Sequence, residues 1–240
     1  MTLAVGIHDL RLGEQPARLN RINLEIRQGE YFGLVGMNGA GKTSLIKCLL
    51  DFCHPDQGEI TLLGQPARTV EAREPLAYLP ERFKAAGHLT GEQFLKRMLA
   101  LFQTPYRRED ALAILSSLAL NNRALTLPLR KHSKGMTQQI GLIACLLSGR
   151  QLLILDEPMS GLDPYARAKL KEILQSRRHS QKPAPTLVMS SHMLTDVETL
   201  CDRIAILHRG ELQFVGSPAE CLKRFAASTL EQAYMNCLSG

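Results

Sequence analysis

The chain has 240 residues, 45% of them hydrophobic, which suffices for one large domain, or a core with a smaller lobe, and argues against disorder. Its formal net charge of +6 fits an anionic ligand, nucleic acid or an anionic membrane surface and does not choose among them. With no tryptophan and only 5% aromatic residues, a stacking platform for single-stranded nucleic acid is not expected.

The cysteines and the apolar runs bear on the cellular compartment. None of the six cysteines forms a C-x-x-C pair, which indicates a reducing cytoplasm and argues against a metal cluster. The start, MTLAVGIHDL, has no basic residues before its apolar stretch and does not resemble a signal peptide. The longest near-continuous apolar run is Ile140–Leu147, whereas a membrane-spanning helix needs about 20 residues. Membrane work is therefore expected to go through a partner.

Short strand patterns recur along the chain. LLIL at 152–155 and TLVM at 186–189 are apolar on both faces, which is typical of buried parallel strands. INLEI at 22–26 alternates and favours an antiparallel sheet with one wet face, and HRGE at 208–211 predicts a hairpin turn. The predicted strands are Ile22–Ile26, Tyr31–Val35, Glu59–Leu63, Leu76–Leu79, Leu152–Leu155, Thr186–Met189 and Arg203–Leu207.

Helical patterns fill the intervals between the strands. Residues 83–149 are mostly helical, with strand-rich sequence on both sides, which predicts a helical subdomain inserted into an α/β core. The predicted helices are Thr43–Phe52, Gly91–Phe102, Glu109–Leu120 and Lys134–Leu147.

GMNGAGKT at 36–43 fits the pattern G-x-x-x-x-G-K-[ST], with a strand before it and a helix after it. Three glycines let the backbone curl so that its N–H groups point at phosphate oxygens. Lys42 is expected to reach the β and γ phosphates, and the Thr43 hydroxyl to ligate Mg²⁺. By itself the motif indicates a nucleoside triphosphate and does not separate kinases, GTPases and ATPases. The expected phosphate-binding residues are Gly36, Asn38, Gly39, Ala40, Gly41, Lys42, Thr43 and Ser44.

LLILDEP at 152–158 places two carboxylates at the end of a buried strand. Asp156 is expected to hold Mg²⁺, directly or through water. Glu157 follows immediately and points elsewhere, so it can polarise an attacking water. A carboxylate aimed at water favours hydrolysis over transfer to a metabolite, and GTPases typically use a glutamine for that water.

SKGMT at 133–137 begins the helix pattern QQIGLIACLL, with Ser133 as the expected N-cap. A serine hydroxyl and a glycine at a helix N-terminus can also form a second phosphate site. If this segment lies on the inserted helical lobe, it cannot easily join the nucleotide that its own P-loop holds.

The order GMNGAGKT, YLPE, SKGMT, LLILDEP, SGLD and SSH resembles ATP-binding cassette (ABC) ATPases over nearly the whole chain. The resemblance implies an α/β fold: a P-loop NTPase (RecA-like) core with an antiparallel β subdomain and an inserted α-helical subdomain. It implies a single ABC domain over 1–240. Its parts would be the core at 1–82 and 150–225, the helical subdomain at 83–149 and a C-terminal helix at 226–240.

The resemblance also implies an arrangement of two copies. They would pair head to tail, with each ATP between one copy's P-loop and the other's Ser133, Gly135 and Met136. Asp163 in SGLD would sit at the dimer seam, and His192 in SSH would contact the γ-phosphate as a catalytic residue. Glu81, at the end of YLPE, would approach Mg²⁺ or the attacking water.

Several positions depart from the family pattern. Glu81 replaces a glutamine, and His132, Lys134 and Met136 alter the usual LSGGQ signature. An aromatic residue that stacks on adenine is absent from GIHDLRLGEQ, which offers only Leu10 and Leu12. The SKGM and YLPE variants look like ATPases of ABC-2-type exporters.

The end of the chain, STLEQAYMNCLSG, resembles the tails of such exporter ATPases, although an ordinary docking helix fits equally well. Ser228 and Glu231 fit a capping box. One helical face carries apolar residues, namely Leu230, Ala233, Tyr234, Cys237 and Leu238.

The resemblance thus implies an ATPase subunit at the cytoplasmic face of a membrane, peripheral through a separate permease that docks at YLPERFKAAGHL. A non-transport ABC ATPase acting on ribosomes or DNA is the alternative. The chain has one cassette, no sustained heptads and no long basic arm, so no nucleic acid is expected. A small-molecule kinase conflicts with Glu157 and with the signature.

Overall fold

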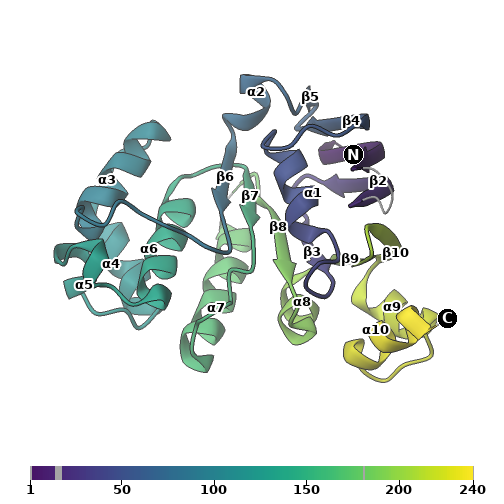
Figure 1. The fold of residues 1–240 in the computed structure, drawn as a ribbon. Helices are drawn as coiled ribbons and strands as arrows, with labels where there is room; N and C mark the ends of the chain where they lie inside the picture. Colours follow the sequence, from purple (N-terminus) through teal and green to yellow (C-terminus); the bar gives the residue numbers. More distant parts are fainter. Residues whose placement is uncertain (1, 14–17, 181, 240) are drawn as a thin grey trace.

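The computed structural model describes residues 2–13, 18–180 and 182–239. Two sheets form its centre, one of six strands and one of four. In Figure 1 the four-stranded sheet lies with the N-terminus, α3 to α6 gather on the far side of the six-stranded sheet, and the last two helices lie apart in yellow.

The six-stranded sheet has the order β10-β9-β3-β8-β7-β6. All neighbours pair in parallel except β9 and β10, which form the hairpin predicted at HRGE. β3, β7 and β8 are buried along their whole length, as their continuous apolar runs predict. The strands are β3 (Tyr31–Val35), β6 (Leu76–Leu79), β7 (Leu152–Leu155), β8 (Thr186–Ser191), β9 (Arg203–His208) and β10 (Glu211–Gly216).

The faces of this sheet pack against two separate cores. Leu153 and Leu155 join the core that contains the apolar sides of α6, α7 and α8. Leu152 and Ile154 point the other way, into the core formed by α1 and the antiparallel sheet. Full burial of each such side chain contributes about 1.5–3 kcal/mol, so both layers hold the central strands in place.

The antiparallel sheet has the order β2-β1-β4-β5. β1 was missed by the sequence analysis because its alternation is interrupted: Asp9 has a φ of 41°, and the register with β2 shifts between Ile7 and Leu10. Such a bulge interrupts the regular alternation of side chains between the two faces of the sheet. The strands are β1 (Leu3–Leu12), β2 (Leu19–Arg27), β4 (Gln57–Leu62) and β5 (Gln65–Pro66).

Helices cover the sheets and form the segment between β6 and β7. Five predicted helices are observed, as α1, α3, α4, α6 and the C-terminal α10, whereas α2, α5, α7, α8 and α9 were not predicted. α7 buries only Ala166, Leu170 and Leu174, and these three residues are too few to give a clear helical pattern in the sequence. The helices are α1 (Lys42–Leu49), α2 (Val70–Arg73), α3 (Gly91–Leu101), α4 (Arg108–Ser117), α5 (Arg123–Thr126), α6 (Lys134–Leu147), α7 (Pro164–Ser180), α8 (Leu194–Leu200), α9 (Pro218–Arg224) and α10 (Leu230–Ser239), with a 3₁₀ turn at Leu129–Lys131.

The last helix, α10, keeps its predicted apolar face but not its predicted cap. The Thr229 hydroxyl accepts the N–H of Gln232, and the Gln232 side chain accepts from Ser228. The capping box assigned to Ser228 and Glu231 is therefore wrong by one residue. In the described parts of the chain, no helix combines the length and the apolar character that crossing a membrane requires.

Candidate nucleotide-binding site

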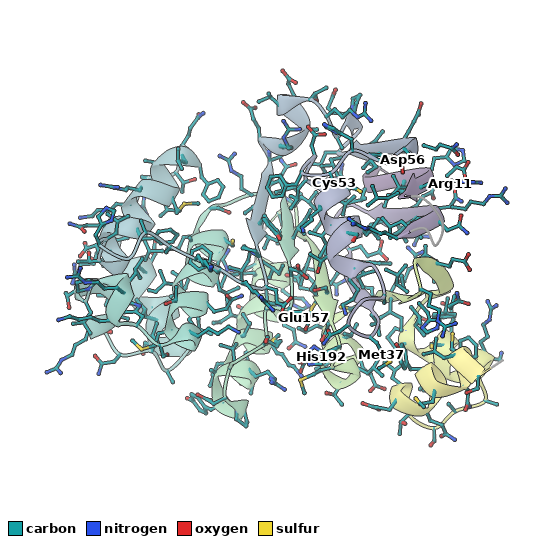
Figure 2. The ribbon with its side chains drawn as sticks, in the orientation of Figure 1. Arg11, Met37, Cys53, Asp56, Glu157 and His192 are labelled. Atoms are coloured by element: carbon teal, nitrogen blue, oxygen red, sulfur yellow. The ribbon has the colours of Figure 1, made fainter. Side chains whose placement is uncertain are left out.

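The candidate site lies at the edge of the central sheet where β3, β7 and β8 end. β3 runs into the P-loop at 36–43, β7 ends before Asp156 and Glu157, and β8 leads to His192. The carboxyl ends of parallel strands meet at one edge, so motifs far apart in the sequence converge there. Figure 2 shows Glu157 and His192 together at this edge, with Met37 of the P-loop nearby.

Glycines shape the P-loop because side chains do not fit its backbone. Gly39 and Gly41 have φ values of +83° and +112°, and a Cβ on Gly36 would come within 2.5 Å of the Leu207 carbonyl oxygen. Lys42, which opens α1, is only 6% exposed and donates from Nζ to the Gly36 carbonyl. The loop and the first turn of α1 thus aim N–H groups and one ammonium at the same space.

Asp156 is a carboxylate buried at the floor of this space, with 1% exposure. The Ser190 hydroxyl donates to its Oδ1 at 2.6 Å and the Thr43 hydroxyl to its Oδ2 at 3.3 Å. Burial raises the pKa of Asp156, the hydrogen bond from Ser190 opposes this, and the charges of Glu81 and Glu157 raise it further. Because the carboxylate is desolvated beside like charges, a bound cation would lower its energy.

The Asp156 carboxylate and the Thr43 hydroxyl are hard oxygen donors of the kind that Mg²⁺ takes. No group of three or more His, Cys, Asp or Glu side chains within the described residues could hold a metal by itself. Mg²⁺ usually takes one or two protein ligands and completes its shell with water and phosphate oxygens, so this small donor set fits it.

Glu157 links the P-loop lysine to His192. Its carboxylate lies 3.6 Å from Lys42 Nζ and 2.8 Å from His192 Nδ1. Its backbone N–H donates to Ser190 Oγ at 2.8 Å, and its φ of 50° is unusual for a residue with a side chain. Glu157 is 8% exposed, whereas the His192 side chain is 53% exposed, so this contact joins a buried carboxylate to an exposed ring.

A cavity of about 530 Å³ is lined by Lys42, Thr43, Asp156 and Glu157, whereas His192, Gly36 and Ala40 are not among its lining residues. Glu81, which is exposed, contributes to its wall as predicted. Arg18 and Arg82 also line it and were not predicted as site residues, because Arg18 lies in no motif and Arg82 was considered only as part of the docking segment YLPERFKAAGHL. Ala40 supports the loop from below, where its carbonyl accepts the Gly210 N–H. The lining is Arg18, Met37, Asn38, Gly39, Gly41, Lys42, Thr43, Ser44, Glu81, Arg82, Asp156 and Glu157.

The signature segment lies away from this cavity. Ser133 caps α6, with its hydroxyl accepting the Met136 N–H at 3.1 Å, and it is exposed. A Cβ on Gly135 would stand 3.0 Å from the Gly161 carbonyl oxygen, so SKGM and SGLD are neighbours. Ser133, Gly135 and Met136 do not line the cavity that contains Lys42.

Two further residues complete this second surface. Asp163 is exposed and caps α7 by accepting the Ala166 N–H at 2.9 Å. Burial lowers the pKa of His132, so its ring is neutral near physiological pH and takes the place of the leucine in the usual signature.

Within the described residues, no aromatic side chain lines the P-loop cavity. Leu10 and Leu12 are 0% and 6% exposed and belong to the core of the antiparallel sheet, so neither reaches the cavity. Arg18 is exposed at the cavity wall instead, and a guanidinium plane can stack on a base. Residues 14 and 15, which end the stretch GIHDLRLGEQ, lie outside the described residues.

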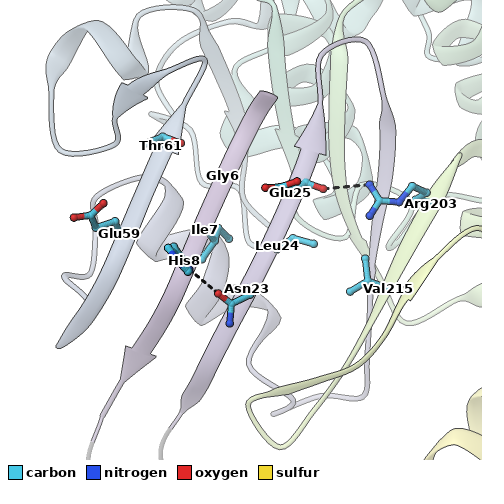
Figure 3. Close-up of a pocket in the computed structure, with 10 residues that line it drawn as sticks. All are labelled: Gly6, Ile7, His8, Asn23, Leu24, Glu25, Glu59, Thr61, Arg203 and Val215. Carbon is cyan, nitrogen blue, oxygen red and sulfur yellow. Dashed lines mark hydrogen bonds between the residues drawn. The ribbon is translucent and has the colours of Figure 1, made fainter. Parts of the chain in front are cut away.

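A second cavity, of about 520 Å³, opens on the outer face of the antiparallel sheet (Figure 3). Some of its polar groups are engaged with one another: His8 Nδ1 lies 2.9 Å from Asn23 Oδ1, and Arg203 donates to the carbonyl of Glu25. The glycine-rich loop and the lysine of the first cavity have no counterpart in this lining, so the P-loop cavity is the candidate active site.

Comparison with known proteins gives the family. The family profile described as ABC transporter matches residues 19–160, more than half of the chain. The chain belongs to the ABC transporter family. Within this ABC family it is 41% identical over 214 residues to an uncharacterized ATP-binding protein of Synechocystis sp., covering 88% of this chain and 60% of that protein. The chain thus spans about three fifths of that relative's length.

Two further ABC relatives carry functional names. The Nod factor export ATP-binding protein I of Sinorhizobium fredii is 33% identical, covering 83% of this chain and 58% of its own length. The linearmycin resistance ATP-binding protein LnrL of Bacillus subtilis is 31% identical, covering 88% and 68%.

Solved ABC structures confirm the α/β P-loop NTPase fold with its antiparallel sheet and helices. An ATP-binding subunit of an ABC transporter superposes with a TM-score of 0.84 at 27% identity, covering 99% of this chain and 100% of that one. A dimeric ATP-binding cassette bound to ADP and Pi gives 0.76 at 19% identity, covering 89% of this chain and 98% of that one, a likeness of fold.

Proposed function

We propose that this chain binds and hydrolyses ATP as the ATPase subunit of an ABC-2-type exporter, at the cytoplasmic face of a membrane and held there by a separate permease. The observation that carries the catalytic part is that Glu157, which lines the P-loop cavity, contacts both Lys42 and His192. Export is supported by the names of the Nod factor and linearmycin relatives, which say what those proteins do.

Each residue at the cavity takes one role. Lys42 and the N–H groups of 36–44 bind the phosphates. Thr43 and Asp156 would hold Mg²⁺, with Glu81 near it, and the ion when bound neutralises charge on the phosphate oxygens. Glu157 accepts the proton of the attacking water, and His192, hydrogen-bonded to Glu157, orients that carboxylate and faces the terminal phosphate.

A second copy of the chain completes the site. Ser133, Gly135, Met136 and Asp163 lie outside the chain's own cavity on exposed or half-exposed backbone turns. Ser133 and Gly135 form a helix N-terminus of the kind that receives a phosphate. We infer that these residues close over the nucleotide of the partner in a head-to-tail homodimer, and that the nucleotide holds the dimer together.

The permease is proposed to dock where the core meets the helical segment, at residues 78–89. Phe52 is 69% exposed there and its ring meets that of Tyr78 edge-on at 6.2 Å. The Gln138 side chain donates from α6 to the Pro80 carbonyl, which ties the signature helix to this segment. An exposed aromatic ring beside a loop that is hydrogen-bonded to α6 suits a protein partner. Recovery of a multi-span protein with the chain from detergent-solubilised membranes tests this docking.

Replacing Lys42 with alanine tests the nucleotide assignment. Lys42→Ala removes the only P-loop ammonium, so we expect ATP hydrolysis to be abolished, as measured by phosphate release from purified protein. Lys47→Ala, at the basic end of α1, is the control and should hydrolyse ATP like the natural chain. Persistent turnover in Lys42→Ala would exclude the P-loop assignment.

Replacing Glu157 with glutamine separates binding from hydrolysis. Glu157→Gln keeps the shape and removes the base, so ATP binding is expected to remain while turnover falls about 10²–10⁴-fold. Binding is measured by equilibrium titration and turnover by phosphate release. Undiminished turnover would remove Glu157 from its role and leave the P-loop assignment intact.

A further inference from the structure

The last helix of the described chain reaches the P-loop. The Tyr234 hydroxyl on α10 accepts a hydrogen bond from the Met37 N–H at 3.1 Å, across 197 positions of sequence. Tyr234 is 8% exposed, whereas Met37 is 61% exposed, so the bond joins a buried side chain to a loop residue that is open to solvent. In Figure 2 Met37 lies on the side of the site that faces the yellow C-terminal helices. None of the motifs that define the site contains Tyr234.

The peptide group between Gly36 and Met37 is held on both sides. Its N–H, from Met37, donates to the Tyr234 hydroxyl, and its carbonyl oxygen, from Gly36, accepts from Lys42 Nζ. The Tyr234 hydroxyl therefore bonds the same peptide group that contacts the P-loop lysine. Binding a phosphate in a loop that is already fixed costs less ordering entropy than binding it in a loose one.

α10 is anchored firmly enough to act as a support. Leu230 and Ala233 are 1% and 0% exposed and belong to the large core that includes Leu194 and Val197 of α8. α8 follows His192 in the chain. Asn236 Nδ2 also donates to the Phe225 carbonyl at the end of α9. One helix thus packs beside the segment that carries His192 and bonds to the loop that carries Lys42.

We propose that Tyr234 is a positioning residue for nucleotide binding, whose hydroxyl fixes the first turn of the P-loop from a helix outside the site. The inference rests on the proposed function, since it assumes that the loop receives the phosphates of a nucleotide. Nucleotide affinity depends on this hydrogen bond. The chemical step does not, because Glu157, Asp156 and His192 are held by other contacts.

Tyr234→Phe tests the proposal because it keeps the buried ring and removes only the hydroxyl. The control is Tyr31→Phe: Tyr31 is 1% exposed and its hydroxyl donates to the Leu174 carbonyl at 2.8 Å, away from the P-loop. Both variants keep the ring and lose one hydrogen bond, so both should melt at a slightly lower temperature than the natural chain.

The deciding measurements use the full chain with ADP and with Mg·ATP. For Tyr234→Phe we expect the Kd for ADP and the KM for ATP to rise about threefold to tenfold, which is what one neutral hydrogen bond contributes, with kcat within about twofold of the natural value. Amide exchange of the peptide covering 34–41 should also be faster. Tyr31→Phe should leave Kd, KM and this exchange unchanged.

Three results would count against the proposal. An unchanged Kd and KM in Tyr234→Phe, with the natural chain binding ADP, overturns the role of Tyr234 alone. An equal rise of KM in Tyr31→Phe shows a general loss of stability and overturns it too. If the natural chain binds neither ADP nor ATP, the proposed function fails and this inference fails with it.

Discussion

At Asp156 the requirements of stability and of function oppose each other. The carboxylate is 1% exposed and two other acids stand beside it, Glu81 and Glu157. Without a cation, burial and the neighbouring negative charges disfavour the ionised carboxylate of Asp156. Its pKa is raised for that reason. A residue that weakens the nucleotide-free fold and helps bind a cation is expected at an active site.

Asp156→Asn is therefore expected to stabilise the nucleotide-free chain at pH 7.5 while abolishing Mg²⁺-dependent turnover. Because the pKa of Asp156 is raised in the fold, protonation stabilises the folded state, and this contribution is lost as pH rises through the raised pKa. The gain in melting temperature should thus shrink as pH falls toward 4. The check is thermal unfolding of both proteins from pH 4 to 8. A lower melting temperature at pH 7.5 would contradict this reading.

Base recognition also depends on single residues. Leu10 and Leu12 are buried, and Arg18 is the exposed side chain of this region that lines the cavity. Arg18→Ala should weaken ATP binding by about twofold to fivefold, because a stacking cation contributes about 0.5–1 kcal/mol at an exposed site. Equilibrium titration with ATP measures it, and Arg21→Ala, which lies outside the cavity lining, serves as the control. Equal affinities for all three proteins would exclude Arg18 from the nucleotide site.

Among the elements, the N-terminus of α6 has a structural role as a helix cap and a proposed role in nucleotide binding. Ser133 caps it by accepting the Met136 N–H, just as Ser217 caps α9 by accepting the Glu220 N–H at 3.2 Å. Loss of either cap costs about 1 kcal/mol, or about 2–4 °C in melting temperature for a chain of this size. Only the Ser133 hydroxyl is proposed to meet the partner's nucleotide.

Ser133→Ala and Ser217→Ala should therefore melt alike and differ in turnover. We expect Ser133→Ala to hydrolyse ATP markedly more slowly and Ser217→Ala to match the natural chain, since α9 does not line the site. Melting curves and phosphate release measured in parallel provide the comparison. Equal turnover in the two variants would show that Ser133 is a helix cap and nothing more.

The elements also show what the sequence can and cannot predict. The parallel strands and the P-loop follow local rules, namely a continuous apolar run or a fixed spacing of glycine and lysine, and these predictions are confirmed. β1 was missed because a bulge breaks its alternation, and α7 because only three of its residues are buried. The cap of α10 was misplaced because Ser228–Glu231 and Thr229–Gln232 fit the same pattern, and the burial of Leu230 and Ala233 selects the second.

The candidate site was predicted where a motif carries the chemistry in consecutive residues. Asp156 and Glu157 lie at the cavity as expected, and so do Lys42 and Thr43. Arg18 and Tyr234 were not found as site residues, because they reach the P-loop through the packing of distant elements and have no local pattern. The roles assigned to these residues stay predictions until the variants are measured, as do the subdomain boundaries at 82/83, 149/150 and 225/226.

At the scale of the whole molecule, the P-loop cavity and the signature segment are two separate surfaces of one chain. The P-loop, Asp156 and Glu157 form one cavity, while Ser133 and Asp163 face solvent elsewhere. We propose that each surface is one half of a nucleotide site. Joining two chains head to tail would complete two sites at once, and cleavage of the terminal phosphate would remove the group that bridges them.

Sedimentation velocity of Glu157→Gln with saturating Mg·ATP tests this claim most directly, because slow hydrolysis should trap the closed state. With Mg·ATP we expect a species of twice the mass of one chain, and with ADP only single chains. Adding Ser133→Arg to this variant should abolish the dimer. A single-chain species at every nucleotide concentration, or a dimer that survives Ser133→Arg, would contradict it.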